Sequence, residues 1–349
     1  MPALAIAAAF RAAHPASRVA LVGAQRGIEA RLLPSRDFPF TLLAAEPIYR
    51  RQWWKNLRWP FLLPGLLRQV DRLLDEERPG FVLGTGGYAA GPVVWRAARR
   101  GIRTAMLELN AYPGLAVRWL AKSVNELWLG SPEARAHLKP GARTEVIDTG
   151  VPITPPDPAL RPEAMQRYGL DPARLVLLIT GGSQGAVALN QVVAEWLQSG
   201  GGERLQVLWS TGKGSHARFA ALHRPPAVQV FEFLDPIGPA YSVADLALTR
   251  AGMMTVAELC AWGIPAILVP LPTAAADHQM FNAHALANAG ASVLLLEREF
   301  TADAFAKTVL PLVHDANRLG ALAKSARGRG HPNAARTIVA KVLELSQVQ

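Results

Sequence analysis

Short runs of apolar residues alternate with stretches of helical periodicity along the whole chain. Each run is followed by a turn and then by apolar positions three and four residues apart, as on one face of a helix. Strands separated by helices pair in parallel and are buried on both faces, which explains why the runs are continuously apolar. The pattern predicts strands at 18–22, 38–43, 80–84, 103–107, 126–129 and 144–147, and again at 175–180, 205–210, 228–233, 245–249, 266–270 and 292–296.

One segment interrupts this rhythm, VPITPPDPALRP at residues 151–162. It holds five prolines and no apolar periodicity, and is therefore typical of a linker. We predict an α/β chain of two doubly wound, Rossmann-like domains, 1–150 and 163–349, which face each other across a ligand cleft at the carboxyl ends of their strands. The last helix of the chain could pack back on the N-terminal domain.

The chain opens with the helical pattern MPALAIAAAF, which leads into the expected strand at 18–22. A helix followed by a strand is the second half of a βαβ unit, so the first strand of the N-terminal sheet is expected to be missing. Such a sheet would keep an unpaired edge. A secretory signal is the competing interpretation, but no basic region precedes the apolar run and Arg11 follows it at once.

Composition narrows the class of protein. Half of the 349 residues are hydrophobic, which suits two buried cores and excludes a disordered chain. A single cysteine, Cys260, excludes an internal disulfide and favours a reducing compartment. No apolar run approaches the length that crosses a bilayer, so a soluble or peripheral protein is expected.

Positive charge is concentrated in the first half, where residues 1–150 carry 21 Lys and Arg against 12 Asp and Glu. A basic surface favours nucleic acid or an anionic membrane, but no nucleic-acid motif accompanies it. The segment 49–70, YRRQWWKNLRWPFLLPGLLRQV, interleaves basic residues with Trp53, Trp54 and Trp59. This mixture is typical of contact with an anionic membrane surface, the alternative being a core helix with a solvated basic edge.

Glycine-rich turns follow one strand of each domain, in FVLGTGGYAAGP and in LVLLITGGSQGAVALN. Glycine lets backbone N–H groups approach a ligand, and the helix that follows favours an anion such as a diphosphate at its amino end. The alternative is a tight turn with no ligand. Neither turn matches G-x-G-x-x-G or the P-loop, which argues against a dinucleotide oxidoreductase and a P-loop ATPase.

Two further segments add side chains suited to sugars. RAGMMTVAE places Glu258 inside a helix that follows a strand, and DHQMFNA places polar side chains at the start of a later helix. A carboxylate accepts hydrogen bonds from vicinal hydroxyls, and amides both donate and accept. The set suits a nucleotide sugar. The alternative is that neither residue binds a ligand. Glu258 would then pair with a neighbouring cation on its own helix, and His278 would be a surface residue or the start of a helix.

These segments together identify a family. The chain resembles the MurG family of family 28-like glycosyltransferases in LGTGGYAAGP, ELNAYPGLAVRWLAK, TGGSQGAVALN, STGKGS, FEFLDP, RAGMMTVAE, GIPAILVPLP and DHQMFNAHAL, in order over nearly the whole chain. The resemblance implies the glycosyltransferase B fold. It also implies inverting transfer of N-acetylglucosamine from UDP-N-acetylglucosamine to lipid I, giving lipid II for peptidoglycan and cell wall synthesis, at the cytoplasmic face of the cell membrane.

The resemblance also assigns roles to residues. Glu258 is expected on the ribose, and Phe233 and Leu234 beside the uracil. The diphosphate is expected to lie on Ser183, Gln184, Gly185, Met254 and Thr255. His278 and Gln279 are expected to face the hydroxyls of the N-acetylglucosamine, with Asn282 supporting them in the substrate site. Gly86, Gly87, Tyr88 and Asn110 are expected to line the acceptor side, with Glu108 as the catalytic candidate.

The chain departs from the family pattern at three places. The family's first glycine loop and its histidine would lie upstream of Met1, so we expect a truncated chain. Leu107 stands where the family has a histidine, with Leu109 in place of a glutamine, and Thr154 stands where the family has an arginine. These departures keep two alternatives open, another lipid glycosyltransferase and a non-catalytic UDP-sugar binding protein. No Asp-x-Asp occurs, so neither a metal nor another cofactor is expected.

Overall fold

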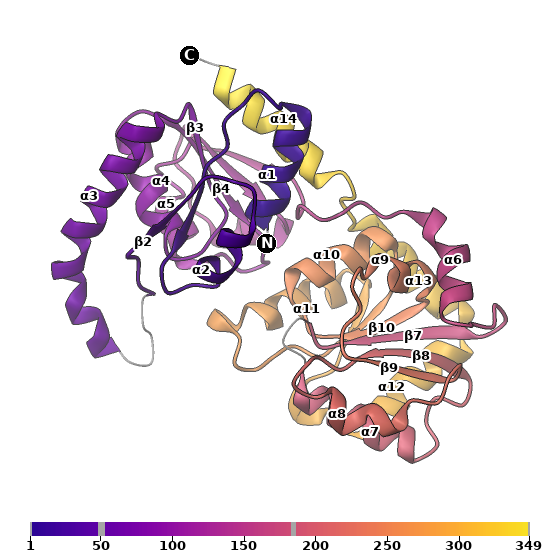
Figure 1. Cartoon of the computed structure of the whole chain (residues 1–349). Coiled ribbons are helices and arrows are strands. Elements are labelled where there is room, and N and C mark those ends of the chain that lie inside the picture. The colour runs from indigo at the N-terminus through magenta and orange to yellow at the C-terminus, as the bar shows by residue number, and fades with distance from the viewer. Residues whose placement is uncertain (1, 48–52, 183–185, 348–349) are drawn as a thin grey trace. The chain divides into compact units, whose positions relative to one another are not determined.

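Two compact units make up the chain, and a computed structural model describes its residues 2–47, 53–182 and 186–347 (Figure 1). Unit 1 comprises Met1–Pro152 and Asn333–Gln349, and unit 2 comprises Ile153–Pro332. The division thus falls near the start of the proline-rich segment 151–162, and the last helix belongs to unit 1.

Unit 2 is built on one parallel sheet of six strands. These are β7 (Leu175–Thr180), β8 (Leu205–Ser210), β9 (Val228–Phe231), β10 (Leu246–Thr249), β11 (Ala266–Leu268) and β12 (Ser292–Leu294). Their order is β9-β8-β7-β10-β11-β12. The chain therefore winds outward from β7 in one direction and then from β10 in the other, which is the doubly wound topology.

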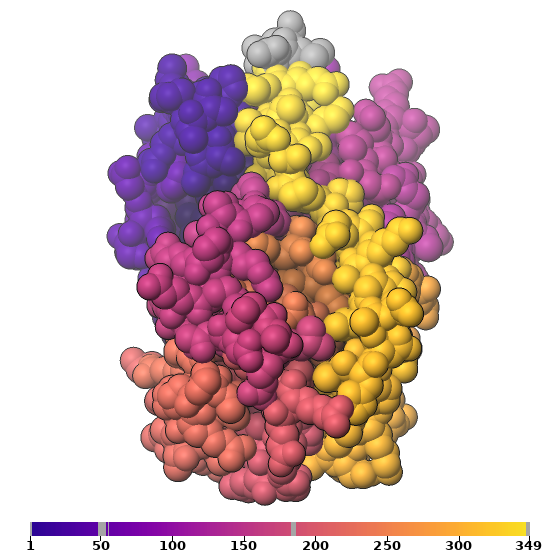
Figure 2. Space-filling model, turned by 90° about the vertical axis from the view of Figure 1, so that its right-hand side faces the viewer, coloured from indigo at the N-terminus to yellow at the C-terminus, as the bar shows by residue number. Residues whose placement is uncertain are grey.

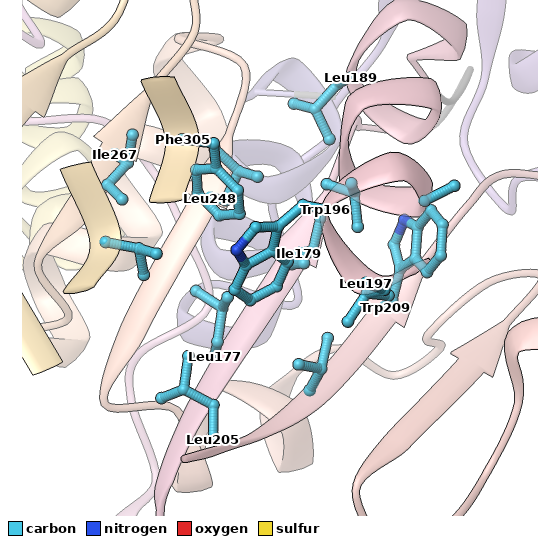
Figure 3. Packing of buried hydrophobic residues seen from close by; sticks show 14 of the residues in the cluster. Leu177, Ile179, Leu189, Trp196, Leu197, Leu205, Trp209, Leu248, Ile267 and Phe305 are labelled. Carbon is cyan, nitrogen blue, oxygen red and sulfur yellow. The ribbon is translucent and has the colours of Figure 1, made fainter. Parts of the chain in front are cut away.

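Helices cover both faces of this sheet. They are α6 (Arg161–Arg167), α7 (Val187–Gln198), α8 (His216–Phe219), α9 (Gly238–Val243), α10 (Met253–Trp262), α11 (His278–Asn288), α12 (Ala302–His314) and α13 (Ala316–Gly328), with short 3-10 turns η4 (Pro158–Leu160), η5 (Ala220–Leu222), η6 (Ala275–Asp277) and η7 (Glu297–Glu299). On one face, Trp196 of α7 meets Phe305 of α12 edge to face, with ring centroids 4.8 Å apart (Figure 3). Both rings are buried over strand residues such as Ile179.

Unit 1 holds two separate parallel sheets. One pairs β1 (Leu21–Ala24) with β2 (Phe40–Leu43), and the other has the order β3-β4-β5-β6, with β3 (Phe81–Gly84), β4 (Arg103–Glu108), β5 (Glu126–Leu129) and β6 (Glu145–Asp148). Within the described residues, no strand pairs with β3 on the side away from β4. As an edge strand, β3 is less buried than the central strand β10 of unit 2. All four residues of β10 are buried, whereas the first three residues of β3 are only half-buried.

The helices of unit 1 come from both ends of the chain. They are α1 (Pro2–Ala13), α2 (Glu29–Leu32), α3 (Trp59–Glu77), α4 (Ala90–Arg99), α5 (Leu115–Leu120) and α14 (Ala334–Gln347), with 3-10 turns η1 (Leu33–Ser35), η2 (Trp53–Arg58) and η3 (Pro132–His137). The first and last helices, α1 and α14, lie side by side, indigo against yellow in Figure 2. Ile338 of α14 is fully buried in one cluster with Trp128 of β5 and Ile6 of α1.

The predicted fold class is confirmed, since both units are parallel α/β layers. Each of the twelve predicted strands overlaps one strand in the described residues, with ends that differ by a few positions. Among those residues, no helix is both long enough and apolar enough to cross a bilayer.

We expect Phe305→Ala to lower the free energy of unfolding of unit 2 by about 3–5 kcal/mol, because the fully buried ring leaves a cavity beside Trp196. The matched control is Leu310→Ala on the same helix, where the side chain is 42% exposed. This control should cost about 0.5 kcal/mol or less, as surface substitutions usually do. Urea unfolding followed by tryptophan fluorescence measures both variants. Equal losses would contradict the packing described here.

Candidate functional site

The order of strands in unit 2 reverses between β7 and β10, which are hydrogen-bonded neighbours. Thr180, the last residue of β7, lies opposite Thr249, the last residue of β10. The crossover from β7 runs to one side of this point and the crossover from β10 to the other. The two loops therefore leave the carboxyl edge in opposite directions, and in open α/β sheets such a switch point is the usual position of a ligand.

The turn after β7 begins with Gly181 and Gly182. Gly182 has a φ of +81°, and its N–H donates to the Thr180 hydroxyl oxygen at 3.3 Å. A side chain would disfavour this backbone conformation, which glycine adopts readily. The start of this turn is thus held to the strand end by a hydrogen bond between Gly182 and Thr180. The predicted ligands Ser183, Gln184 and Gly185 lie outside the described residues.

The turn after β10 leads through Gly252 into α10. Met254 and Thr255 lie in the first turn of this helix and are half-buried. The first helical hydrogen bond runs from the Val256 N–H to the Gly252 carbonyl at 3.0 Å. The N–H groups of the first turn therefore have no partner within the helix and can meet an anion.

Glu258 lies in the second turn of α10, and one of its oxygens, Oε2, accepts a hydrogen bond from the Tyr241 hydroxyl at 2.8 Å. Its partner is thus a phenol from α9, not a cation on its own helix. Burial raises the pKa of the Glu258 carboxyl, and the hydrogen bond from Tyr241 opposes this rise. The remaining oxygen, Oε1, is suited to accept from the hydroxyls of a ligand.

Helix α11 begins with the two predicted sugar ligands. Oε1 of Gln279 accepts from the Leu271 N–H at 3.0 Å, so its amide nitrogen is the group left to donate. Nδ1 of His278 lies 2.6 Å from the Ala275 carbonyl oxygen. A carbonyl only accepts, so this nitrogen carries hydrogen and, in the neutral ring, Nε2 is an acceptor.

Asn282 differs from these two, because it is fully buried. Its Nδ2 donates to the Ala251 carbonyl at 3.1 Å, in the turn between β10 and α10. In this structure Asn282 therefore supports the turn and is not placed to meet a sugar itself.

Phe233 and Leu234, the predicted neighbours of uracil, follow β9 and point differently. Phe233 is 54% exposed, whereas Leu234 is buried. An exposed aromatic face is suited to stack on a planar base, and the buried Leu234 supports the loop from below.

In unit 1 the glycine turn follows β3. Gly86 and Gly87 have φ values of +91° and +80°, and Tyr88 beside them is 48% exposed. Glycine adopts such φ values without strain. The neighbouring strand β4 ends at Glu108, so both loops lie at the same edge of this sheet.

Glu108 is buried and accepts hydrogen bonds from its own loop. Its oxygens accept from the N–H groups of Asn110 at 2.9 Å and Gly114 at 2.6 Å, and from the Asn110 amide at 3.1 Å. Burial raises the pKa of the Glu108 carboxyl, against these hydrogen bonds. The geometry makes Glu108 the centre of the 108–114 loop, and its catalytic role stays a prediction.

Comparison with known proteins places these two units in one family. Residues 1–128 match the glycosyltransferase family 28 N-terminal domain, and residues 176–338 match the glycosyltransferase family 28 C-terminal domain. A relative from Carboxydothermus hydrogenoformans is 37% identical over 331 residues, covering 93% of this chain and 88% of the relative. The chain belongs to glycosyltransferase family 28.

A second relative supports the same family assignment. One from Streptomyces collinus is 36% identical over 354 residues, covering 98% of this chain and 94% of its own length. Both relatives are named UDP-N-acetylglucosamine--N-acetylmuramyl-(pentapeptide) pyrophosphoryl-undecaprenol N-acetylglucosamine transferase. The crystal structure of Acinetobacter baumannii MurG matches with a TM-score of 0.78 and 28% identity, over 98% of this chain and 95% of the other.

Two departures from the family pattern can be placed. Leu107 is buried, and Leu109 packs against the cluster that contains it and Ile338 of α14. These positions therefore serve the packing of the last helix. Thr154 is exposed at the start of unit 2.

The structure also bears on metal binding and on the single cysteine of the chain. In the described ranges, no group of three or more His, Cys, Asp or Glu side chains is arranged to hold a metal ion, and the expectation of no cofactor stays a prediction. Cys260 is buried, and burial raises the pKa of its thiol to about 12. The thiol is therefore protonated at neutral pH and unsuited as a nucleophile.

Sequence reasoning missed three residues of this site, Tyr241, Arg250 and Glu297. Tyr241 and Glu297 stand in segments without a motif, and only the fold brings them to Glu258 and Arg250. Arg250 opens the motif RAGMMTVAE and so carried a signal, because an arginine directly after a buried strand needs a partner.

We expect Tyr241→Phe to shift the acid limb of UDP binding to higher pH. The variant removes a hydrogen bond that lowers the pKa of Glu258, so the carboxyl stays protonated up to a higher pH and is then a poorer acceptor for the hydroxyl groups of a ligand. Calorimetric titration of UDP from about pH 5 to pH 8 measures the shift. Tyr168→Phe in the same unit is the control, and an unshifted limb in Tyr241→Phe would contradict a role for Glu258.

Proposed function

We propose that the chain transfers N-acetylglucosamine from UDP-N-acetylglucosamine to the lipid-linked N-acetylmuramyl-pentapeptide, with inversion at the anomeric carbon. The observation that carries this proposal is the match to transferases of that name over almost the whole chain, together with a carboxylate, Glu258, beside the switch point of unit 2. In this proposal the donor binds unit 2, and unit 1 recognises the acceptor.

The donor side is proposed from the geometry of three elements. Glu258 Oε1 accepts from the ribose hydroxyls, and Phe233 stacks on the uracil. The diphosphate meets the N–H groups at the start of α10 and the glycine turn after Thr180. Gln279 and His278 face the sugar. The Gln279 amide nitrogen donates a hydrogen bond and His278 Nε2 accepts one, which suits hydroxyl groups because they both donate and accept.

The reaction exchanges one bond to the anomeric carbon for another. A hydroxyl of the muramyl sugar forms the new C–O bond and gives its proton to a base, while the C–O bond to UDP breaks and UDP keeps the electron pair. Negative charge therefore develops on the diphosphate as the bond breaks. The amino end of α10 and the backbone donors of the glycine turn stabilise this charge.

On unit 1, we propose that Gly86, Gly87 and Tyr88 contact the acceptor together with Asn110. Glu108 holds the Asn110 loop through its hydrogen bonds to Asn110 and Gly114. The sequence predicts Glu108 as a catalytic candidate, and a carboxyl whose pKa is raised by burial is suited to take a proton from an acceptor hydroxyl within its reach.

The acceptor carries a lipid, and unit 1 offers a surface for one. The first turns of α3 project beyond the sheets of their unit (Figure 1). On η2 and these turns, Trp54, Leu57 and Phe61 are 54%, 66% and 86% exposed. The other end of α3 is held by ion pairs of 2.7 Å from Asp71 to Arg96 and Arg100.

Exposed aromatics next to cations suit the interface of an anionic membrane, where rings lie among the headgroups. Arg58 and Arg68 are exposed on the same segment. We therefore propose that the exposed apolar residues of 54–63 bind the cytoplasmic face of the cell membrane. Trp59 departs from the prediction, since it packs against the core of unit 1, and the side chain of Trp53 lies outside the described residues.

The reaction is tested by release of UDP from UDP-N-acetylglucosamine in the presence of lipid I or of diacylglycerol. We expect release with lipid I alone. Release with diacylglycerol alone would identify another lipid glycosyltransferase, and release with neither would make the chain a UDP-sugar binding protein.

Within that assay we expect Glu258→Gln to raise the KM for UDP-N-acetylglucosamine about tenfold or more, because a hydrogen bond to a charged acceptor is worth about 1.5–3 kcal/mol. Glu195→Gln, on an exposed position of α7, is the matched control and should leave KM unchanged. A KM that moves equally in both variants would rule out the assignment of Glu258 to the ribose.

For the membrane, we expect the double variant Trp54→Ala and Phe61→Ser to lower the fraction bound to anionic vesicles several-fold, since burial of an aromatic side chain contributes about 1.5–3 kcal/mol. Sedimentation with phosphatidylglycerol vesicles measures binding. Leu310→Ala, an exposed apolar position of unit 2, is the control. Unchanged binding of the double variant would assign the surface to another role.

A further inference from the structure

The turn Arg250–Gly252 sets the direction in which α10 leaves the sheet. It is short, and its residues Arg250 and Ala251 are buried, with exposed fractions of 8% and 0%. The polar groups of a buried turn need hydrogen-bond partners, and these partners restrict the conformations that the turn can adopt. Two side chains from other elements hold it.

The first hold is made by Arg250 itself. Its Nη1 donates to the Val269 carbonyl at 3.1 Å, directly after β11. Its Nη2 pairs with the carboxylate of Glu297, in η7 beyond the end of β12. One guanidinium thus links the carboxyl ends of three neighbouring strands, β10, β11 and β12. Nε of Arg250 is buried with no hydrogen-bond partner in the described residues, which lowers the stability of the fold. The two bonds made by Nη1 and Nη2 therefore come with a cost in folding free energy.

The second hold comes from the opposite element, α11. The fully buried Asn282 donates to the carbonyl of Ala251 at 3.1 Å. This carbonyl is in the peptide that leads into Gly252, the cap of α10. Arg250 therefore fixes the beginning of the turn, and Asn282 fixes its middle.

We propose that Arg250, Glu297 and Asn282 are positioning residues, which aim the unpaired N–H groups at the amino end of α10 toward the diphosphate of the donor. The proposal rests on the proposed function, because the diphosphate belongs to that donor. The proposal gives two parts of α10 different roles: the amino end of the helix binds the diphosphate, and Glu258 binds the nucleoside. Glu258, one turn further along, is held independently by Tyr241.

This separation gives a readout that a general loss of stability would not produce. Release of the turn should weaken a ligand that carries the diphosphate and leave a ligand that carries only the nucleoside nearly unchanged. We expect Glu297→Gln and Asn282→Ala to raise the Kd of UDP about tenfold or more, since a small misplacement of donors is costly at a charged group. The Kd of uridine should change by less than about twofold.

Matched controls lie on the same elements. Glu299→Gln is exposed two residues after Glu297, and Asn288→Ala is exposed on α11. Arg250→Lys keeps the positive charge but not the forked geometry, and it carries the test if Glu297→Gln fails to fold. We expect Arg250→Lys to weaken UDP as well and both controls to bind UDP like the unmodified chain.

Hydrogen exchange of peptides covering 250–258 gives a measurement that does not depend on a ligand. We expect faster exchange there in Glu297→Gln and Asn282→Ala than in the two controls. If the unmodified chain does not bind UDP, the proposed function fails, and the exchange result alone decides whether the turn is held as described. Folded variants with unchanged exchange, or with UDP and uridine weakened equally, would overturn the proposal.

Discussion

Parallel pairing of strands is the constraint on which the rest of the structure depends. Each crossover returns the chain to the same end of the sheet, so every strand of unit 2 finishes at one edge. At β7 and β10 the winding reverses, and the loops after Thr180 and Thr249 separate there. Glycine turns, a helix amino end and Glu258 gather at this edge because the topology delivers them, although they are far apart in the sequence.

Hydrogen bonds from other parts of the chain hold three residues of the candidate site or of the turn before α10 in place. Tyr241 holds Glu258, Asn282 holds Ala251, and Leu271 holds Gln279. Each support lies in an element other than the one it holds. A displacement of α9 or α11 would therefore be passed on to α10 and to the turn before it through these hydrogen bonds.

Much of this was predictable from the sequence, because a strand buried on both faces is predominantly apolar. The runs LVLLIT and LQVLWS predict β7 and β8 at their observed bounds. The inward position of Trp59 was missed, because Trp59 was assigned to the membrane surface, although it shares a helix face with Leu66 and Val70 at spacings of seven and eleven residues. The pairings of Tyr241 and Glu297 were not predictable, because they depend on the directions of loops that leave different strands.

The assignment of α14 to unit 1 has a consequence for the order in which the protein folds. Unit 2 is one continuous stretch of chain, Ile153–Pro332, inserted within unit 1. The cluster around Trp128 contains Ile6 of α1 and is completed by Ile338 and Leu345 of α14. During synthesis α14 is the last of the described helices to be made, so the apolar residues of unit 1 that Ile338 covers stay without this cover until α14 has formed and packed.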